Sequence, residues 1–322
     1  MTPKVEFCAR CCMSNQRGIA SREYAREVGS EPARLQFRDG VCLACIFSES
    51  QKSVDWAERE ARLLELLDYY RRADGPDVVV GSSGGKDSAY VSHILKTKYG
   101  MHPLTVTWSP HHQTDIGRKN FEAWLDAGFD NIRVTPNRQV QRVLTRLAFT
   151  NLAHPFQPFI MGQRSLAPRI AANYDIGLVM FGEDDAFYEG VSGWQERRDE
   201  PTSWKDMRFA GLSVSELEQH GISKADLHMY LPAPNNPDIQ LRAFSRYVKW
   251  TPQANYYYAA EHTGFSRGEE RTEGSFSAYS SLDDAVDCLH YACTYTKWGL
   301  GRASHDASQE IRNGHLTREE GV

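Results

Sequence analysis

The stretch that decides the fold is Asp77-Val78-Val79-Val80-Gly81-Ser82-Ser83-Gly84-Gly85-Lys86-Asp87-Ser88. Its β-branched start predicts a short strand buried in a parallel sheet, and the following Ala89-Tyr90-Val91-Ser92-His93-Ile94-Leu95 predicts a helix. A glycine-rich loop joins the two. Backbone N–H groups converge in such a loop, and the next helix presents its positive end, so the segment is typical of a phosphate-binding site.

The loop is not a Walker A sequence, because its first glycine is one position too close and Asp87 replaces the hydroxyl residue. It resembles the S-G-G-x-D-S loop of PP-loop (N-type) ATP pyrophosphatases. Asp87 is a poor direct partner for phosphate, so we expect Mg²⁺ to bridge its carboxylate to phosphate oxygens. A turn that binds no ligand is the alternative. The residues expected to hold ATP are Ser82, Ser83, Gly84, Gly85, Lys86, Asp87 and Ser88.

Strand and helix patterns alternate after this loop. Strands are expected at residues 104–108, 131–134 and 177–181, and helices at 120–127 and 139–151. Short links between them predict an α/β fold with a doubly wound parallel sheet of the adenine-nucleotide alpha-hydrolase (PP-loop) type. The later region, rich in Pro, Trp and Tyr up to about residue 280, gives no clear element.

Ligands of doubly wound folds bind at the carboxyl edge of the sheet. We therefore expect the adenine there, and Glu183, which ends a predicted strand, to hold Mg²⁺ or orient ammonia; an exposed loop acid is the alternative for Glu183. The residues expected near the adenine are Val106, Thr107, Trp108, Gly162 and Gln163.

The first fifty residues carry two CxxC pairs, Cys8-x2-Cys11 and Cys42-x2-Cys45. Four thiolates from two such pairs suit tetrahedral Zn²⁺. Because so polar a segment cannot build a core alone, zinc would contribute roughly 10–16 kcal/mol to its folding. Cys12 follows Cys11 directly, so the second zinc ligand is one or the other of these two cysteines. Buried or redox-active cysteines are the alternatives to a metal site.

Composition sets the background. Among 322 residues, 41% are hydrophobic and 25% charged, as in ordinary globular proteins, and a net charge of −5 provides no chain-wide basic field for nucleic acid. No apolar run is long enough for a membrane span, and the N-terminus lacks a signal sequence, so we expect a cytoplasmic protein. The expected units are a zinc module (1–52), a linking helix (53–75), the PP-loop domain (76–190) and a substrate-binding C-terminal region (191–322).

With these residues placed, the chain resembles the N-acetyl sugar amidotransferases of bacterial surface-polysaccharide biosynthesis, which include enzymes named for pseudaminic acid and for lipopolysaccharide O-antigen. The resemblance runs from Cys8 to about Glu320. Two departures are Ser14, where the family usually has proline, and the lack of a further helical tail. The blocks that carry it include Pro103–Trp108, Ile116–Asn120, Leu144–Phe149, Gln157–Gln163, Phe181–Glu183, Asn255–Ala259, Glu261–Phe265, Lys297–Arg302, Asp306–Gly314 and Thr317–Glu320.

The resemblance implies that an acetamido group on a nucleotide-linked sugar becomes an acetamidino group. Transfer of AMP from ATP to the amide oxygen makes that oxygen a leaving group, and ammonia then displaces AMP. Positioning and charge stabilisation, without covalent catalysis, accomplish this. Relatives take ammonia from a class I glutaminase with a cyclase-like barrel partner; consistently, Thr2 rather than cysteine follows Met1.

Site residues follow from the same resemblance. Catalysis is assigned to Lys86, Asp87, Glu183, Lys297 and Arg302, and substrate binding to His262, Arg312 and Arg318. Lys297 and Arg302 resemble the late basic residues that grip leaving pyrophosphate. The alternatives are solvated surface charges for these two, pairing with nearby glutamates for Arg312 and Arg318, and a structural histidine for His262.

Two rival functions remain. Some tRNA-thiolating PP-loop enzymes also carry CxxC zinc modules, but they need a redox-competent cysteine pair beside ATP. Here the spare cysteines are Cys12, Cys288 and Cys293, of which the last two are expected to be buried in a helix. A non-catalytic regulator that binds zinc and nucleotide is the other rival. ATP turnover that depends on a sugar would support the amidotransferase, and turnover that depends on tRNA and a sulfur source would support the thiolating enzyme. No turnover would support the regulator.

Overall fold

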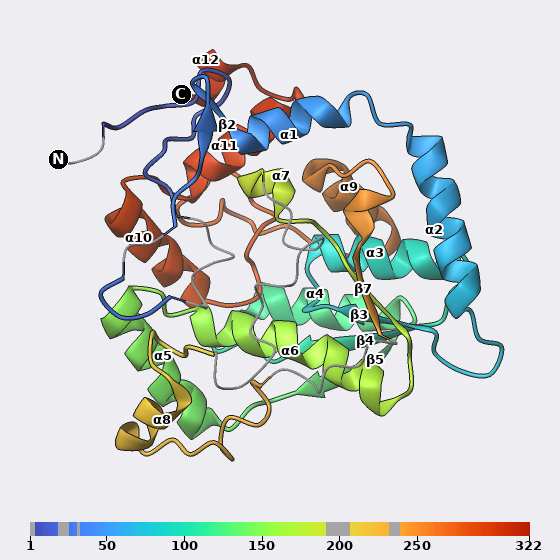
Figure 1. The fold of residues 1–322 in the computed structure, drawn as a ribbon. Coiled ribbons are helices and arrows are strands. Elements are labelled where there is room, and N and C mark those ends of the chain that lie inside the picture. Colours follow the sequence, from blue (N-terminus) through green and yellow to red (C-terminus); the bar gives the residue numbers. More distant parts are fainter. Residues whose placement is uncertain (1–3, 19–25, 31–32, 191–206, 232–238) are drawn as a thin grey trace.

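The computed structural model describes residues 4–18, 26–30, 33–190, 207–231 and 239–322. Its centre is a five-stranded, fully parallel sheet with the strand order β5-β4-β3-β6-β7 (Figure 1). The strands are β3 (Val78–Gly81), β4 (Pro103–Trp108), β5 (Asp130–Val134), β6 (Leu178–Phe181) and β7 (Gln240–Ala243).

The sheet is doubly wound, which confirms the predicted α/β class. The chain starts at β3 in the middle, proceeds outward to β4 and β5, and returns to add β6 and β7 on the other side. Val80 of β3 is therefore in register with both Thr105 of β4 and Met180 of β6. At this reversal of strand order the loops after β3 and β6 diverge and leave a crevice, where such folds bind ligands.

Helices cover both faces of the sheet, which explains why β3 is apolar throughout. Val79 packs on one face with α5 and α6, whereas Val78 and Val80 pack on the other with α2 and α3. The helix α9 lies against α3. These helices are α2 (Trp56–Tyr70), α3 (Lys86–Thr97), α5 (Arg138–Leu152), α6 (Gln157–Asn173) and α9 (Pro252–His262), and α4 (Asp115–Asp126) links β4 to β5.

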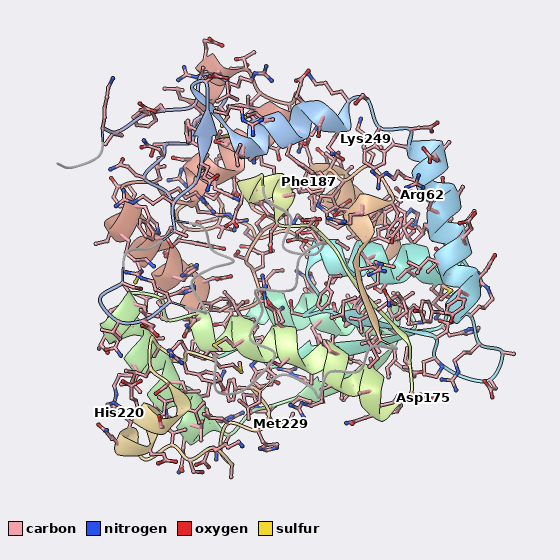
Figure 2. All side chains as sticks on the ribbon, viewed as in Figure 1. Arg62, Asp175, Phe187, His220, Met229 and Lys249 are labelled. Carbon is pink, nitrogen blue, oxygen red and sulfur yellow. The ribbon has the colours of Figure 1, made fainter. Side chains whose placement is uncertain are left out.

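Two elements of the central layer were not expected from the sequence. The helix α6 contains Pro158 in its first turn, where proline is tolerated, and Pro168 inside, where proline is a signal against a helix. The strand β7 is an edge strand of which only Ala243 is buried, so it lacks the apolar run of β3. Between α6 and β7, residues His220 and Met229 belong to a segment that contains the short helix α8 (Val214–Leu217) and packs beside α5 and α6 (Figure 2).

The first and last segments of the chain lie side by side (Figure 1). The cysteine module has strands β1 (Phe37–Arg38) and β2 (Val41–Cys42) and helix α1 (Leu43–Gln51). The Cys12 amide donates to Ser308 Oγ, and Ser48 Oγ donates to the Arg312 carbonyl. The last helices are α10 (Val286–Trp298), α11 (Arg302–Asn313) and α12 (Arg318–Gly321), and α7 (Ala186–Glu189) packs against both α1 and α11. No described helix has the length and apolar character needed to cross a membrane.

Candidate functional site

The loop after β3 has the backbone of an anion-binding nest. Gly85 is the N-cap of α3, so the free amides of the first helical turn point toward the loop. Gly84 has a φ of +86°, and a Cβ on it would lie 2.7 Å from Phe121 Cα. Only glycine satisfies both conditions at this position.

Two loop hydroxyls shape the nest from within. Ser82 Oγ accepts the Gly84 amide at 3.1 Å and lies 2.7 Å from Ser88 Oγ, which also donates to the Gly85 carbonyl at 3.0 Å. The hydroxyl of Ser83 instead bonds to Asp283, which comes from the C-terminal region. The phosphate loop is thus tied to a segment two hundred residues away in sequence.

Lys86 and Asp87 form a close, oriented pair at the start of α3. Lys86 Nζ lies 2.5 Å from Asp87 Oδ2, and Asn255 Nδ2 of α9 donates to Asp87 Oδ1 at 2.9 Å. Lys86 is only 8% exposed, and its Nζ lies 5.7 Å from the centre of the Tyr279 ring. The ammonium group is therefore placed by its neighbours rather than left in solvent.

Glu183 follows β6 on the opposite side of the crevice, where the sequence placed it. Burial raises its pKa to about 7, the nearby Asp87 carboxylate adds to this, and Lys86 opposes it. Gly182 brings the backbone close, since a Cβ there would lie 3.9 Å from Asp87 Cβ. Two carboxylates that repel one another beside a phosphate nest fit a divalent cation.

These groups open into one cavity of about 580 Å³ that extends from the phosphate loop to α10 and α11. Of the residues predicted for the site, the whole loop Ser82–Ser88 lines it, together with Gln163, Glu183 and Arg302. The structure thus brings together the phosphate loop, the end of β6 and the start of α11.

The residues expected around adenine are mostly in the core, which corrects that placement. Trp108 is 2% exposed, and Gly162 lies so close to it that a Cβ would be 2.2 Å from the indole ring. Val106 and Thr107 are each 1% exposed, and the Thr107 hydroxyl accepts from Asn131 Nδ2. None of these four predicted residues lines the cavity.

Arg302, the first residue of α11, lines the same cavity as Lys86. Its Nε donates to Asp306 Oδ1 at 2.7 Å, and its guanidinium lies against the Tyr291 ring and donates to the Tyr291 hydroxyl at 3.1 Å. Burial alone would lower the pKa of Arg302, but Tyr291 and Asp306 outweigh it and raise the pKa. Arg302 therefore remains a cation facing the cavity.

Four other predicted residues lie away from the cavity lining. Lys297 Nζ lies 5.3 Å from the Trp298 ring centre. His262 stacks against the ring of His93. Arg312 NH1 reaches Cys11 Sγ at 4.0 Å, and Arg318 belongs to α12 beside the cysteine module. Direct contact of these four with a ligand in the cavity is not supported.

Sequence reasoning missed several residues that do line the cavity, among them Arg17, Asp283, Asp287 and His290. Burial and the neighbouring Asp283 raise the pKa of Asp287 to about 7. Burial lowers the pKa of His290 to about 3, so its imidazole is neutral. No local motif marks these residues; only the contact between distant segments makes them neighbours.

The predicted cluster of four cysteines is confirmed. The Sγ atoms of Cys8, Cys11, Cys42 and Cys45 are buried and lie within 4.8 Å of one another. Backbone amides of Arg10 and Cys42 donate to Cys8 Sγ, at 3.4 Å each. Cys12 is not a member, because its Sγ contacts the Gly321 carbonyl at 3.2 Å. Four thiolates with amide donors are the ligand set of a structural zinc site.

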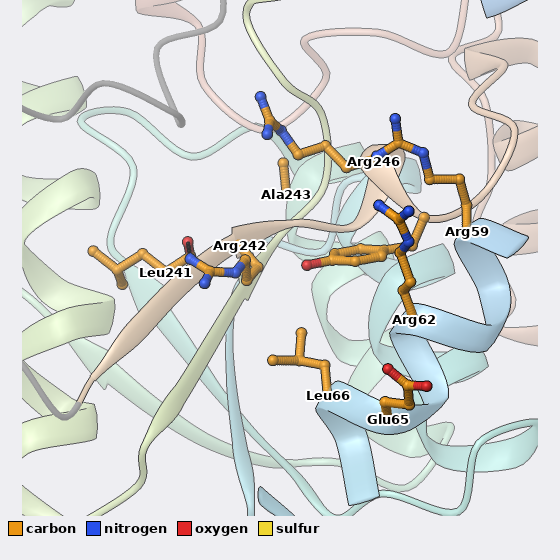
Figure 3. A pocket seen from close by; sticks show the side chains of 9 residues that line it. Arg59, Arg62, Glu65, Leu66, Leu241, Arg242, Ala243 and Arg246 are labelled. Atoms are coloured by element: carbon orange, nitrogen blue, oxygen red, sulfur yellow. Dashed lines mark hydrogen bonds between the residues drawn. The ribbon is translucent and has the colours of Figure 1, made fainter. Parts of the chain in front are cut away.

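A second hollow, of about 640 Å³, lies between α2 and β7, away from the phosphate loop (Figure 3). Arg59 and Arg62 project from α2, and Arg242 projects from β7. Arg246 of the same hollow donates to Asp184 Oδ2 at 2.7 Å, next to Glu183. The hollow contains no residue of the loop Ser82–Ser88 and is separate from the cavity described above.

Comparisons with known proteins bear first on the C-terminal region. Residues 273–322 match the domain described as "LPS biosynthesis protein WbpG-like, C-terminal domain". This agrees with the resemblance to lipopolysaccharide O-antigen enzymes seen in the sequence. The matched domain contains Arg302, Asp283 and Asp287 of the cavity. Among curated proteins, none matches the chain in sequence.

Several solved structures are similar at low identity. U34-tRNA thiolase NcsA from Methanococcus maripaludis is 13% identical, with 90% of this chain and 86% of that chain covered and a TM-score of 0.37. NMN synthetase from Francisella tularensis is 13% identical over 82% and 94%, with a TM-score of 0.35. NH3-dependent NAD synthetase from Campylobacter jejuni subsp. jejuni is 17% identical over 41% of this chain and 58% of that chain, with a TM-score of 0.31. At these TM-scores the similarity carries no inference about activity.

Proposed function

We propose that the protein is an ATP-dependent amidotransferase that converts an acetamido group of a nucleotide-linked sugar into an acetamidino group. The observation that carries the proposal is a single cavity that combines a PP-loop, Ser82–Ser88, with residues of a WbpG-like C-terminal domain. ATP and the second substrate can therefore meet in one space.

The proposed reaction has two steps. The acetamido oxygen attacks the α-phosphorus of ATP, the bond to pyrophosphate breaks, and an imidoyl adenylate forms. Ammonia then adds to the carbon, a proton leaves, and AMP departs with the former amide oxygen. Each step needs in-line positioning and charge stabilisation, and neither needs a covalent bond to the protein.

Residues that line the cavity can serve the two proposed steps. The loop amides and Lys86 hold the phosphates of ATP, and Arg302, which lines the same cavity, stabilises the departing pyrophosphate. Asp87 and Glu183 would hold Mg²⁺, which would neutralise phosphate charge. Glu183 has an alternative role to that of a Mg²⁺ ligand: with no metal bound to it, its pKa of about 7 suits it to orient ammonia and accept a proton from ammonium.

We further propose that the four-cysteine cluster binds zinc, which would cross-link the two CxxC segments. We also propose that ammonia comes from a class I glutaminase with a cyclase-like barrel partner. That part rests on the sequence resemblance alone.

The geometry disfavours tRNA thiolation. All seven cysteines belong to the described residues, and none of them lines the cavity. Cys288 and Cys293 are on α10, and burial raises the pKa of both thiols. A pair of low-pKa cysteines beside ATP, which sulfur transfer requires, is therefore missing.

The test is to incubate the protein with ATP, Mg²⁺, ammonium and a panel of UDP-linked acetamido sugars. We expect AMP and pyrophosphate only when the correct sugar is present, and a product in which an imino group replaces oxygen. An oxygen isotope label in the acetamido group should appear in AMP. Formation of ADP and phosphate, or AMP without the isotope label, would reject the proposal.

A further inference from the structure

Arg17 is an arginine of the cysteine module that reaches the cavity of the phosphate loop. It lies between the two CxxC pairs in sequence, yet it lines the same cavity as Lys86 and Arg302. Its Nε is buried and has no hydrogen-bond partner, and its guanidinium forms no ion pair with the described residues. A buried guanidinium nitrogen without a hydrogen-bond partner is costly, and Arg17 is half-buried at the cavity, so its position points to an anionic ligand.

The backbone that carries Arg17 is fixed. The Arg17 amide donates to the Ser14 carbonyl at 3.4 Å, and the Leu35 amide donates to the Arg17 carbonyl at 2.8 Å. The next residue, Gly18, packs so closely on the C-terminal helix α10 that a Cβ would lie 2.5 Å from the Trp298 ring. The module is thus held against α10, and Arg17 is directed into the cavity.

The charges around Arg17 are unbalanced in a way that suits an oxyanion. Its electrostatic neighbours are Glu189 and Asp306, which favour its charge, and Arg302 and Arg312, which oppose it. Asp306 is already bonded to Arg302 at 2.7 Å. Arg17 therefore retains unused donors, in the planar arrangement that matches phosphate oxygens.

The charged groups that surround Arg17 differ from those that surround Glu183 at the phosphate loop. The electrostatic neighbours of Glu183 include Asp87 and Lys86, whereas those of Arg17 are Arg302 and residues of α7 and α11. If the loop holds the phosphates of ATP, the Arg17 end of the cavity is left for the second substrate.

We infer that Arg17 binds phosphate oxygens of the nucleotide-linked substrate, so that the cysteine module is a part of the substrate site. This inference rests on the proposed function for the identity of the second substrate. Phosphate oxygens come from two sources in this reaction, ATP and the sugar nucleotide, and the experiment must separate them.

The experiment titrates UDP and, separately, α,β-methylene-ATP into the full chain with its metal bound. Arg17→Gln should weaken UDP binding by about tenfold to a hundredfold, as expected for loss of a charged hydrogen bond, and leave binding of the ATP analogue unchanged. The UDP affinity of Arg17→Lys should lie between those of the wild type and Arg17→Gln. The matched control is Arg10→Gln, in the same module, where Arg10 is exposed and forms an ion pair with Glu49; it should change neither affinity.

Metal content and thermal unfolding of each variant show whether the module is intact. The inference is overturned if wild type does not bind UDP, if Arg17→Gln binds it as tightly as wild type, or if the ATP analogue loses affinity instead. Because the titrations need no turnover, the two proposals fail separately. If Arg17→Gln loses UDP binding but the wild type forms no amidine product, the proposed reaction alone is rejected. If the wild type forms the amidine and Arg17→Gln has an unchanged KM for the sugar, the Arg17 subsite alone is rejected.

Discussion

Glu183→Gln should stabilise the ligand-free protein, and the gain should grow with pH. Burial and Asp87 raise the pKa of Glu183 from 4.5 to about 7. Between these two values the folded state keeps the proton that the unfolded state has released. The free energy of unfolding of the wild type therefore falls as pH rises through this range, and above pH 7 the full cost is present. Glutamine does not titrate and escapes this cost.

The magnitude follows from the same two values. A pKa moved from 4.5 to about 7 corresponds to about 3 kcal/mol between the protonation states. Part of that cost is already present at pH 5.5, so the stability gap between Glu183→Gln and wild type should widen by about 2 kcal/mol from pH 5.5 to pH 8.5. This range keeps the cysteine cluster above the pH at which acid releases a metal.

The assay is urea unfolding, followed by tryptophan fluorescence, at pH values across this range and without ATP or Mg²⁺. Glu218→Gln is the control, because Glu218 is an exposed acid on the 3-10 turn Glu218–His220. It reports the effect of removing one surface charge. A stability gap for Glu183→Gln that stays constant with pH, or that widens toward acid, would refute the argument that Glu183 is buried beside Asp87. Saturating Mg²⁺ should stabilise the wild type and so reduce its stability difference from Glu183→Gln, because a cation between the carboxylates favours their charged forms.

Three further predictions concern the loop and the metal. Lys86→Ala should lower kcat for AMP release by about 10²–10³-fold with unchanged metal content, since it removes a preorganised charge at the phosphates; activity near that of wild type would reject the loop assignment. Cys42→Ser should abolish zinc binding, measured by atomic absorption, whereas Cys12→Ser should retain it; equal zinc content in both would contradict the ligand set. Gly84→Ala should destabilise the protein by about 1–3 kcal/mol in thermal unfolding, because of its positive φ and the Phe121 backbone. An unchanged Tm would be inconsistent with this loop conformation.

The phosphate loop and the inner strands could be predicted because their signals are local. Val78–Val80 form an unbroken β-branched run, and the glycines that follow mark a tight loop between a strand and a helix. The same reasoning failed for adenine at Val106, Thr107 and Trp108. Helices cover both faces of the sheet, so strand residues point into the two cores, and the crevice begins only beyond the strand ends.

The other half of the cavity could not be derived residue by residue. Arg302 and Lys297 resembled each other in sequence as late basic residues, but α10 ends at Trp298, and the glycines before α11 turn the chain. As a result Arg302 faces the cavity and Lys297 does not. Arg17 gave no signal at all, because its place depends on the packing of Gly18 against Trp298, a contact between the two ends of the chain.

The same contact shows how the small cysteine module takes part in the cavity of the parallel-sheet fold. Sheet and helices alone supply the phosphate loop and Glu183, which form one wall of the cavity. Further lining residues come from α11 and, with Arg17, from the cysteine module, whose small apolar cluster includes Met13, Leu35 and Leu300 of the C-terminal region. The four cysteines belong to this apolar cluster, and hydrogen bonds to Ser308 and Arg312 fasten the module to α11. Anchored in this way, the module places Arg17 at the cavity that the loop Ser82–Ser88 also lines.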